Sequence, residues 1–413
     1  MNGKHIGGFC VAVLAAMAVS AQIELIAPAN NAVVRQMHTL QREFAKAPRA
    51  KFEKCFDGAE NATKLKSKGS LPVPIKLEWK GDAPEYQVTV RRLPDGKVVF
   101  NQTVATNCVA VDSLEIATEW EWTVSAGSDK LVSTFKTEDC LPRLVRMTGT
   151  ANCRDIGGRR GLDGRRIRQG LVYRTAGLNS NAPVEYYSKD EILELEKDGK
   201  LKKMGHTGRA LHRKLKAGEE LTSALAKKSR LVKRKCFAPG KRRFTDDEVA
   251  RILKVYGIRS DIDLRRDDEC YGMTGSPLGP SVKWFHISYS AYSGAFTTNG
   301  MAITKAVFDV FMDDANYPLI FHCIGGADRT GTVAMLLEAL LGVPEDEIWR
   351  DYLTTGFVGV VSDPAHKKSF GAAMDHLKGY PGDTLADKAE AYFLKLGFTK
   401  DDVSRLRERL LEP

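Results

Sequence analysis

From residue 144 onward, apolar runs of strand length alternate with amphipathic helical patterns, and this alternation restricts the fold more than any other feature. The runs are GLVYRT, GIRSDIDLR, VKWFHISY and YPLIFHC, and the helical patterns include DEVARILKVY, AITKAVFDVFMDD and TVAMLLEALL. Strands that alternate with helices favour a parallel sheet, because the chain must cross over between neighbouring strands. We therefore predict an α/β domain over 144–413, with a mostly parallel central sheet flanked by helices.

The region before this domain has a different pattern. It contains short alternating runs separated by turn signals: VPIKLEW, EYQVTVRRL, KVVFNQTV, EWEWTVSA and LVSTFKT. Repeated short strands of this kind are typical of a β-sandwich. Their succession resembles a fibronectin type III or immunoglobulin-like domain, so we predict a small β-sandwich domain over 22–140. A chain of 413 residues exceeds the usual size of one hydrophobic core, in agreement with two domains.

The N-terminus has the composition of a secretory signal peptide. Lys4 and His5 precede the apolar run IGGFCVAVLAAMAV, and the small residues SAQ follow it. A positive start, a short apolar stretch and a small-residue cleavage site are the three parts of such a signal. The run is short for a membrane span. We predict a signal peptide over 1–21 and a secreted or periplasmic protein, in which an odd number of cysteines leaves at least one thiol unpaired.

The net charge of +10 is concentrated in one segment. Between Lys197 and Arg243 there are 17 lysines and arginines against three acids. This segment belongs to an insertion at about 181–245 that interrupts the α/β pattern with helix-like spacing and few apolar residues. It is either a solvated surface, or a lid or surface that attracts an anionic partner. Because aromatic residues are not interleaved with the cations, we predict no nucleic-acid partner.

The stretch FHCIGGADRTGT, residues 321–332, joins a buried strand to a buried helix through a glycine-rich turn. A helix N-terminus offers unpaired N–H groups and the positive end of a dipole, so it binds anions. Gly325 and Gly326 allow successive N–H groups to converge on one phosphate. The same field favours thiolate over thiol at Cys323, and Arg329 can hold two phosphoryl oxygens. The pattern predicts a nucleophile directed at phosphorus.

Other interpretations of this turn fit less well. A Walker A loop requires a lysine after the second glycine, and this stretch has none. A rhodanese-type loop generally has a shorter spacing between cysteine and arginine. A purely structural cysteine beside a glycine turn would leave Arg329 without a role.

Cys-x5-Arg-Thr after a strand and a histidine resembles the signature of the cysteine-dependent protein tyrosine phosphatase superfamily. The stretch ANCRDIGGRRGLDGRRIRQGLVYRTAGLN at 151–179 is similar to the opening motif of a bacterial tyrosine and dual-specificity phosphatase family that includes lipid-phosphatase-like members. DIDLRRDDE at 261–269, DYL at 351–353 and the C-terminal LKLGFTKDDVSRLRERLL follow the same order. The resemblance covers about 144–410 and does not extend to the N-terminal domain.

The resemblance implies a role for each residue of the signature. It makes Cys323 the nucleophile, Arg329 the phosphate clamp and Asp328 the acidic residue of the loop. The phosphate cradle is formed by Ile324, Gly325, Gly326, Ala327 and Thr330, whose hydroxyl could donate to the sulfur. No metal or organic cofactor is implied, because the amide cradle and Arg329 stabilise the charge.

Residues outside the signature are implied to support the site. They are His322, Arg154, Asp155 and Arg174. We interpret Asp263 and Arg265 as scaffold residues rather than catalytic ones.

Two departures from the family pattern concern the chemistry. Many relatives have a lysine, linked to phosphoinositide use, where this chain has Ala327. Many also carry a general-acid aspartate on the loop after the preceding strand, but SYSAYSGAF at 288–296 contains no acid. Either Asp328 protonates the leaving group, or Asp267 or Asp268 does, or the enzyme is slow.

These observations predict a secreted phosphatase that hydrolyses phosphotyrosine or phosphoserine/threonine in proteins through a phosphocysteine intermediate. The first alternative is a phosphoinositide or inositol-phosphate phosphatase, whose polyanionic substrate the basic insertion would attract. The second is a phosphate-binding pseudophosphatase, for which the loop without an acid is the argument and intact Cys323 and Arg329 are the counter-argument.

Overall fold

The computed structural model describes residues 23–52, 54, 69–180, 184–229, 231–235, 240–358 and 364–413. The chain divides into two compact units, one of residues 1–36 and 73–139 and the other of residues 37–72 and 140–413. The predicted signal peptide lies outside the described residues. Among the helices that are described, none combines the length and apolarity needed to cross a membrane.

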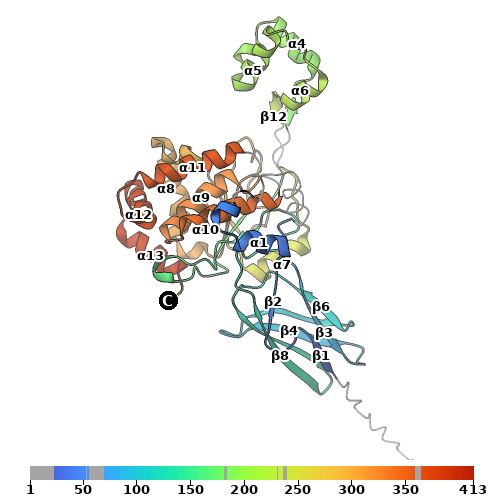
Figure 1. Cartoon of the computed structure of the whole chain (residues 1–413). Helices are drawn as coiled ribbons and strands as arrows, with labels where there is room; N and C mark the ends of the chain where they lie inside the picture. Colours follow the sequence, from blue (N-terminus) through green and yellow to red (C-terminus); the bar gives the residue numbers. More distant parts are fainter. Residues whose placement is uncertain are drawn as a thin grey trace, which may run out of the picture. The chain divides into compact units, whose positions relative to one another are not determined.

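The first unit is built from two β-sheets (Figure 1). The larger sheet has the strand order β2–β8–β7–β4–β5 and the smaller one β1–β3–β6. Trp79 of the smaller sheet and Trp120 and Trp122 of the larger one are buried in one shared core. Two sheets around a common core agree with the predicted sandwich architecture, while the fibronectin-like topology stays a prediction. The strands are β1 (Glu24–Ala27), β2 (Ala32–Val34), β3 (Ile75–Lys80), β4 (Tyr86–Arg92), β5 (Val98–Val104), β6 (Cys108–Val111), β7 (Glu119–Ala126) and β8 (Asp129–Thr137).

The segment 37–72 differs from the sequence prediction, which places it in the N-terminal domain. It belongs to the second unit and carries helices α1 (Thr39–Lys46) and α2 (Arg49–Phe52). Phe44 and Phe52 are buried in the main core of that unit. The Nη1 atom of Arg350 donates hydrogen bonds to the carbonyl oxygens of Phe44 and Ala47, at 2.9 and 2.8 Å. The segment belongs to the second unit because its apolar side chains are buried there, although it lies in the N-terminal part of the sequence.

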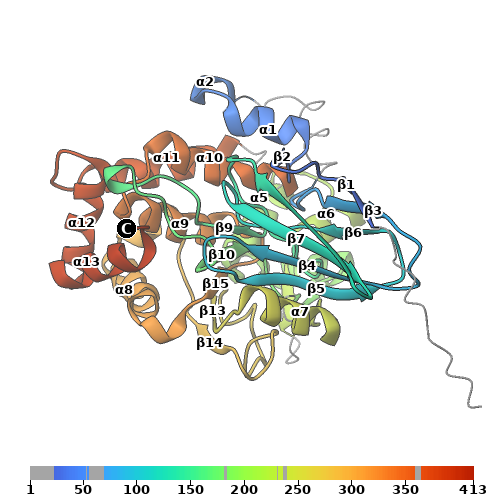
Figure 2. The same cartoon turned by 90° about the horizontal axis from the view of Figure 1, so that it is seen from below.

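The second unit contains a five-stranded sheet in the order β14–β13–β15–β10–β9, which Figure 2 shows. The four strands β14, β13, β15 and β10 are parallel, and the short β9 is antiparallel to β10. In this register His322 at the end of β15 is level with Asp263 of β13 and with Thr175 of β10. The carboxyl ends of three strands therefore meet at one edge, where α/β folds place their sites. The strands are β9 (Arg154–Asp155), β10 (Val172–Thr175), β13 (Ser260–Asp263), β14 (Lys283–His286) and β15 (Leu319–His322).

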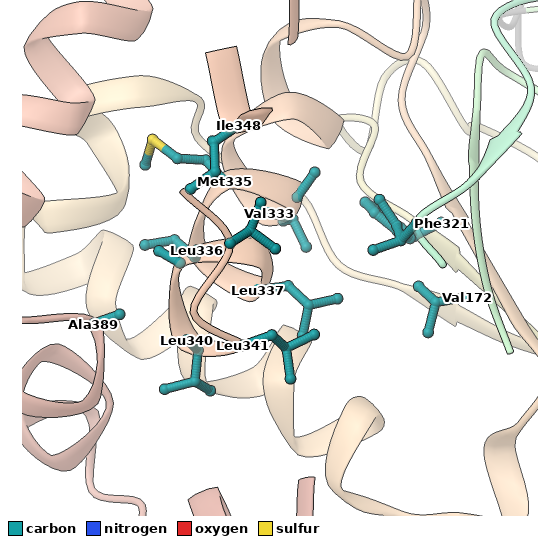
Figure 3. Packing of buried hydrophobic residues seen from close by; sticks show 14 of the residues in the cluster. Val172, Phe321, Val333, Met335, Leu336, Leu337, Leu340, Leu341, Ile348 and Ala389 are labelled. Carbon is teal, nitrogen blue, oxygen red and sulfur yellow. The ribbon is translucent and has the colours of Figure 1, made fainter. Parts of the chain in front are cut away.

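Helices cover both faces of this sheet, because β10 and β15 carry apolar side chains on both sides. Val172 and Phe321 face one cluster with α8–α13, whereas Tyr173 and Ile320 face another with α7. Figure 3 shows α9 between the strands that carry Val172 and Phe321 and the helix that carries Ala389. The prediction of a mostly parallel sheet flanked by helices is confirmed. The helices are α7 (Asp246–Tyr256), α8 (Thr298–Met312), α9 (Asp328–Leu340), α10 (Glu345–Thr354), α11 (Pro364–Lys378), α12 (Leu385–Leu396) and α13 (Lys400–Leu410).

The basic insertion, which Figure 1 shows as a group of short helices and strands, has a small apolar core of its own. Ile192, Leu201 and Leu211 are buried in this core, although the segment contains few apolar residues. At its start Ser188 caps the first helix, and its Oγ accepts the N–H of Glu191 at 3.3 Å. Strands at its two ends pair antiparallel. Its elements are β11 (Val184–Tyr186), α4 (Lys189–Lys197), η2 (Leu201–Lys203), α5 (Gly205–Lys216), α6 (Ser223–Ser229) and β12 (Val232–Lys235).

Candidate active site

The loop between β15 and α9 places Cys323 at the carboxyl edge of the sheet and at the N-terminus of a buried helix. The side chain of Cys323 is buried, and Ile324 beside it is exposed. Gly326 has φ +67°, and a Cβ atom at this position would lie 2.5 Å from the carbonyl oxygen of Thr175. Only glycine fits here, because the left-handed conformation and the close approach to a strand coincide.

The carbonyl groups of this loop are held from outside. Asn152 Nδ2 donates to the oxygens of Gly325 and Gly326, each at 3.1 Å, and Arg174 Nη2 donates to that of Gly326 at 2.8 Å. The N–H of Gly177 donates to the oxygen of Ile324 at 2.9 Å. Within the described part of the chain, the N–H groups of residues 324–327 donate to no other residue. A loop with its carbonyls tied back and its N–H groups unused is an anion-binding cradle.

Three buried arginines converge behind the cradle on Asp351 of α10. Arg154 Nε lies 2.7 Å from Asp351 Oδ1 and Arg159 Nη2 lies 2.6 Å from the same atom, while Arg174 Nη1 donates to Oδ2. Burial opposes ionisation of Asp351, but these arginines hold the pKa of its carboxyl well below the usual range. The cluster links the opening motif, β10 and α10 into one support, and its positive charge lies near the anion site.

Asp155 fixes the shape of the opening motif itself. Its carboxylate accepts hydrogen bonds from the N–H of Gly157 at 2.7 Å and of Gly170 at 2.6 Å. Arg143 Nη1 donates to it at 2.7 Å. Asp155 is fully buried. The implied supporting role of Arg154, Asp155 and Arg174 therefore has a geometric basis, although Arg154 and Asp155 reach the cradle only through other residues.

Arg329, in the first turn of α9, is oriented by Glu269. Its Nη1 atom donates to Glu269 Oε2 at 2.7 Å and to the carbonyl oxygen of Leu264 at 3.3 Å. Burial disfavours the charge, but the hydrogen bond with Glu269 leaves the pKa of Arg329 raised. No hydrogen bond from Nε or Nη2 to another described residue is present. Those two donors remain for a bound phosphate.

His322, before the cysteine, lies between two buried aspartates. Its Nε2 atom is 3.0 Å from Asp261 Oδ1, without hydrogen-bond alignment, and its Nδ1 atom is 3.8 Å from Asp263 Oδ1. Burial works against the charged imidazolium, but the two carboxylates raise the pKa of His322. Asp263 also accepts from Arg265 Nη2 at 2.6 Å, and both residues are fully buried. This pairing supports the interpretation of Asp263 and Arg265 as scaffold.

Asp328 is surrounded by hydroxyl groups and one imidazole. The phenol of Tyr292 donates to Asp328 Oδ1, and the Tyr352 hydroxyl lies 2.7 Å from that of Tyr292. His366 Nε2 is 3.9 Å from the same Oδ1 atom. The carboxylate is about two-fifths exposed, so it is accessible from solvent.

The other two candidate acids are engaged elsewhere. Asp267 is 90% exposed, 3.9 Å from His286, and Asp268 pairs with Arg266 at 3.1 Å. Thr330 is fully buried and its hydroxyl has no hydrogen-bond partner among the described residues, so its predicted bond to the sulfur stays a prediction.

Cys323 differs in its position from two other buried thiols that the structure describes, Cys153 and Cys270. Burial raises the pKa of Cys153 to about 12 and that of Cys270 beyond its usual range. Neither thiol is therefore a ready nucleophile. Cys323 alone among these three stands at a helix N-terminus beside an arginine.

The comparisons with known proteins agree with this geometry. The tyrosine phosphatase family model matches residues 145–189 and 228–412, which is more than half of the chain. The chain belongs to the tyrosine phosphatase family. The residues between the two matched parts fall within the basic insertion.

Two relatives are similar to part of the chain. One is a protein from Cupriavidus necator assigned as a tyrosine-protein phosphatase, 28% identical over 209 residues, which cover 49% of this chain and 59% of that protein. The other is a tyrosine-protein phosphatase from Nostoc commune, 28% identical over 199 residues, which cover 38% of this chain and 68% of that protein. The chain thus spans about three-fifths of the length of the Cupriavidus relative.

Sequence reasoning misses several residues of the site. Asn152, Glu269 and Asp351 lie inside the motifs that the sequence singles out, but spacing alone does not show what each one contacts. Tyr292 lies in the loop that the sequence describes only by its lack of an acid. Its signal, a tyrosine in the loop that lacks an acid, becomes visible only when Asp328 is placed beside it.

Proposed function

We propose that this protein is a cysteine-dependent phosphomonoesterase that forms a phosphocysteine intermediate at Cys323. The observation that carries the proposal is the cradle, in which Asn152 and Arg174 bind the carbonyls and leave the N–H groups for an anion. Family membership supports a phosphorylated substrate. A site of this kind stabilises the transferring phosphoryl group with fixed dipoles and one arginine.

The reaction proceeds in two displacements at phosphorus. First the thiolate of Cys323 attacks, the S–P bond forms, and the P–O bond to the leaving group breaks. The leaving oxygen takes a proton from Asp328, while the amides and Arg329 hold the other phosphoryl oxygens. Water then attacks phosphorus and gives a proton to Asp328. The P–S bond breaks, which returns the thiolate and releases inorganic phosphate.

The proposed substrate is a phosphoprotein, with phosphotyrosine first and phosphoserine or phosphothreonine as the dual-specificity extension. Ala327 stands where phosphoinositide-cleaving relatives carry a lysine, so nothing in the loop itself adds affinity for a second phosphate. We also propose, from the sequence of residues 1–21, that the enzyme acts outside the cytoplasm. N-terminal sequencing of the mature protein tests that location.

A polyphosphorylated substrate is the second candidate, and the exposed face of α5 favours it. Arg209, Arg213 and Lys216 follow one another at helical spacing and are exposed, while Leu211 on the opposite face is buried. These three cations have no acidic partner among the described residues. Two nearby acids are already paired: Glu196 with His212 at 2.7 Å, and Glu219 with Lys214 at 2.9 Å. The face is thus a cationic surface suited to a polyanion.

The Cys323→Ser variant tests the covalent mechanism. We expect it to lose turnover of p-nitrophenyl phosphate while binding of vanadate, measured by calorimetry, is largely retained. Activity above a hundredth of wild type would refute the phosphocysteine route. A wild-type protein that binds vanadate but turns over neither aryl phosphates nor phosphopeptides would be a phosphate-binding pseudophosphatase instead.

A further inference from the structure

Tyr292 comes from the loop that lacks an acid and reaches Asp328, a carboxylate in the first turn of α9 next to the cradle. It opens the short helix η3 (Tyr292–Phe296), and its phenol donates to Asp328 Oδ1. Its ring also contacts that of Tyr352 edge to face, with 6.4 Å between the ring centroids. The loop that contains no general acid therefore supplies the principal hydrogen-bond donor to Asp328.

The backbone of Tyr292 is held in an uncommon conformation by α9. Its φ is +57°, a left-handed conformation that is uncommon for a residue with a side chain and typical of functional positions. Its N–H donates to Thr332 Oγ1 at 2.8 Å, and that hydroxyl donates to the carbonyl oxygen of Asp328 at 2.8 Å. Tyr292 is thus tied to the turn that carries Asp328 through both its backbone and its side chain.

The phenol of Tyr292 is a permanent donor. Burial, together with Tyr352 and Asp328, raises the pKa of Tyr292 far above its usual range, so it keeps its proton at any working pH. The Tyr352 hydroxyl is 2.7 Å away and can donate to the oxygen of Tyr292 in turn. His366 Nε2, at 3.9 Å, approaches the same Oδ1 atom. In the described part of the chain, no hydrogen bond reaches Asp328 Oδ2.

This asymmetry determines which oxygen of Asp328 carries the proton. A neutral carboxyl group has one accepting and one donating oxygen. Because Oδ1 is occupied by a permanent donor, the proton resides on Oδ2, the oxygen without a partner. A carboxylic acid with a fixed orientation is more effective in proton transfer than one that rotates freely.

We propose that Tyr292 is a positioning residue that orients Asp328 as the general acid. Tyr292 touches neither the phosphorus nor the leaving group and acts only through Asp328. The inference rests on the proposed function, in which Asp328 protonates the leaving oxygen and later accepts a proton from water.

The experiment compares two esters in the Tyr292→Phe variant, which keeps the ring and removes only the hydroxyl. Phenyl phosphate has a poor leaving group that needs protonation, whereas p-nitrophenyl phosphate needs little. We expect kcat/KM to fall at least about tenfold more for phenyl phosphate than for p-nitrophenyl phosphate. This difference is a part of the full rate effect of a general acid. The ratio of the two esters is independent of the fraction of active enzyme, so a partly misfolded variant would not imitate this result.

The double variant separates positioning from structural support. In an Asp328→Asn background, Tyr292→Phe should have no further effect on the ratio, since it acts through the lost carboxyl group. Tyr289→Phe is the matched control. It removes a buried hydroxyl of the same segment that lies 3.1 Å from Thr304, and should leave the ratio unchanged.

An unchanged ratio in Tyr292→Phe, with the ratio altered in Asp328→Asn, would overturn the inference and leave the proposed function intact. Equal effects of Tyr292→Phe with and without Asp328 would also overturn it. Failure of the proposed function itself is recognised separately, because Cys323→Ser would then retain turnover.

Discussion

Replacement of Gly326 by alanine tests whether the cradle depends on its close approach to β10. The backbone at this position is left-handed, and an added Cβ would meet the carbonyl oxygen of Thr175 at 2.5 Å and its carbonyl carbon at 2.7 Å. Both atoms belong to the central sheet, where they cannot yield easily. The loop must therefore move away from β10, and its two donors would lose the carbonyl oxygen of residue 326.

The cost is the sum of three contributions. A left-handed alanine costs about 1–2 kcal/mol, the bond from charged Arg174 about 1.5–3 kcal/mol and the bond from Asn152 about 0.5–1.5 kcal/mol. We expect Gly326→Ala to lose about 3–6.5 kcal/mol of unfolding free energy, by addition of these ranges. Displaced amides should also lower kcat/KM at least about 100-fold, the effect of one missing oxyanion donor.

Urea denaturation and p-nitrophenyl phosphate kinetics measure these two losses. The matched control is Gly164→Ala, because Gly164 also has a left-handed φ, +73°, but an added Cβ would meet no atom within 4 Å. It should lose only the conformational contribution, about 1–2 kcal/mol, and keep its rate. If the two variants were equally stable and equally active, the close packing of the cradle on β10 would have no functional weight.

Three other variants test the roles of charged side chains. Arg329→Lys should lower kcat/KM for p-nitrophenyl phosphate by about 3 kcal/mol or more in activation free energy, because a point charge replaces a fork, and near-normal kinetics would contradict the clamp. Burial raises the pKa of Glu338 from 4.5 to about 8, so the folded state holds a proton that the unfolded state has lost, and stability falls as pH rises through that window. The unfolding free energy should fall by at most about 1.4 kcal/mol per pH unit. In urea titrations between pH 5 and 8, Glu338→Gln should reduce this dependence on pH, and an unaltered dependence would exclude Glu338 as its source. Neutralising Arg209, Arg213 and Lys216 together to glutamine should raise KM for an inositol polyphosphate and weaken its salt dependence, with p-nitrophenyl phosphate as the unaffected control; equal kinetics on both substrates would make this face of α5 an ordinary solvated surface.

Much of the site can be predicted from sequence because the residues that would contact a phosphate are close together in the chain. A strand, a glycine turn and a helix within residues 319–340 bring Cys323 and Arg329 into one loop, and more distant residues such as Glu269 then orient the side chains. Local patterns also give the strand–helix alternation of the second unit. These features depend on periodicity and backbone preference, which a single sequence displays directly.

What sequence reasoning misses depends on contacts between distant segments. Asp351 meets Arg154 across 197 positions, and Glu269 meets Arg329 across 60. A charge in the sequence does not reveal its partner, and each of these acids could equally have faced solvent. The assignment of residues 37–72 to the second unit is missed for the same reason, because the sequence does not show in which core a phenylalanine is buried.

The stem of the basic insertion makes that segment a detachable module. The N–H of Ser180 donates to the carbonyl oxygen of Lys241 at 2.9 Å, and the N–H of Lys241 donates to Ser180 Oγ at 2.7 Å. Beyond this point β11 and β12 pair as well, with Val184 opposite Lys235. The segments that begin and end the insertion therefore lie side by side. A short turn could replace the residues between them without a change in the backbone of the phosphatase fold. Such a position lets a protein of this fold gain or exchange a small surface module without rearranging the loop that carries Cys323.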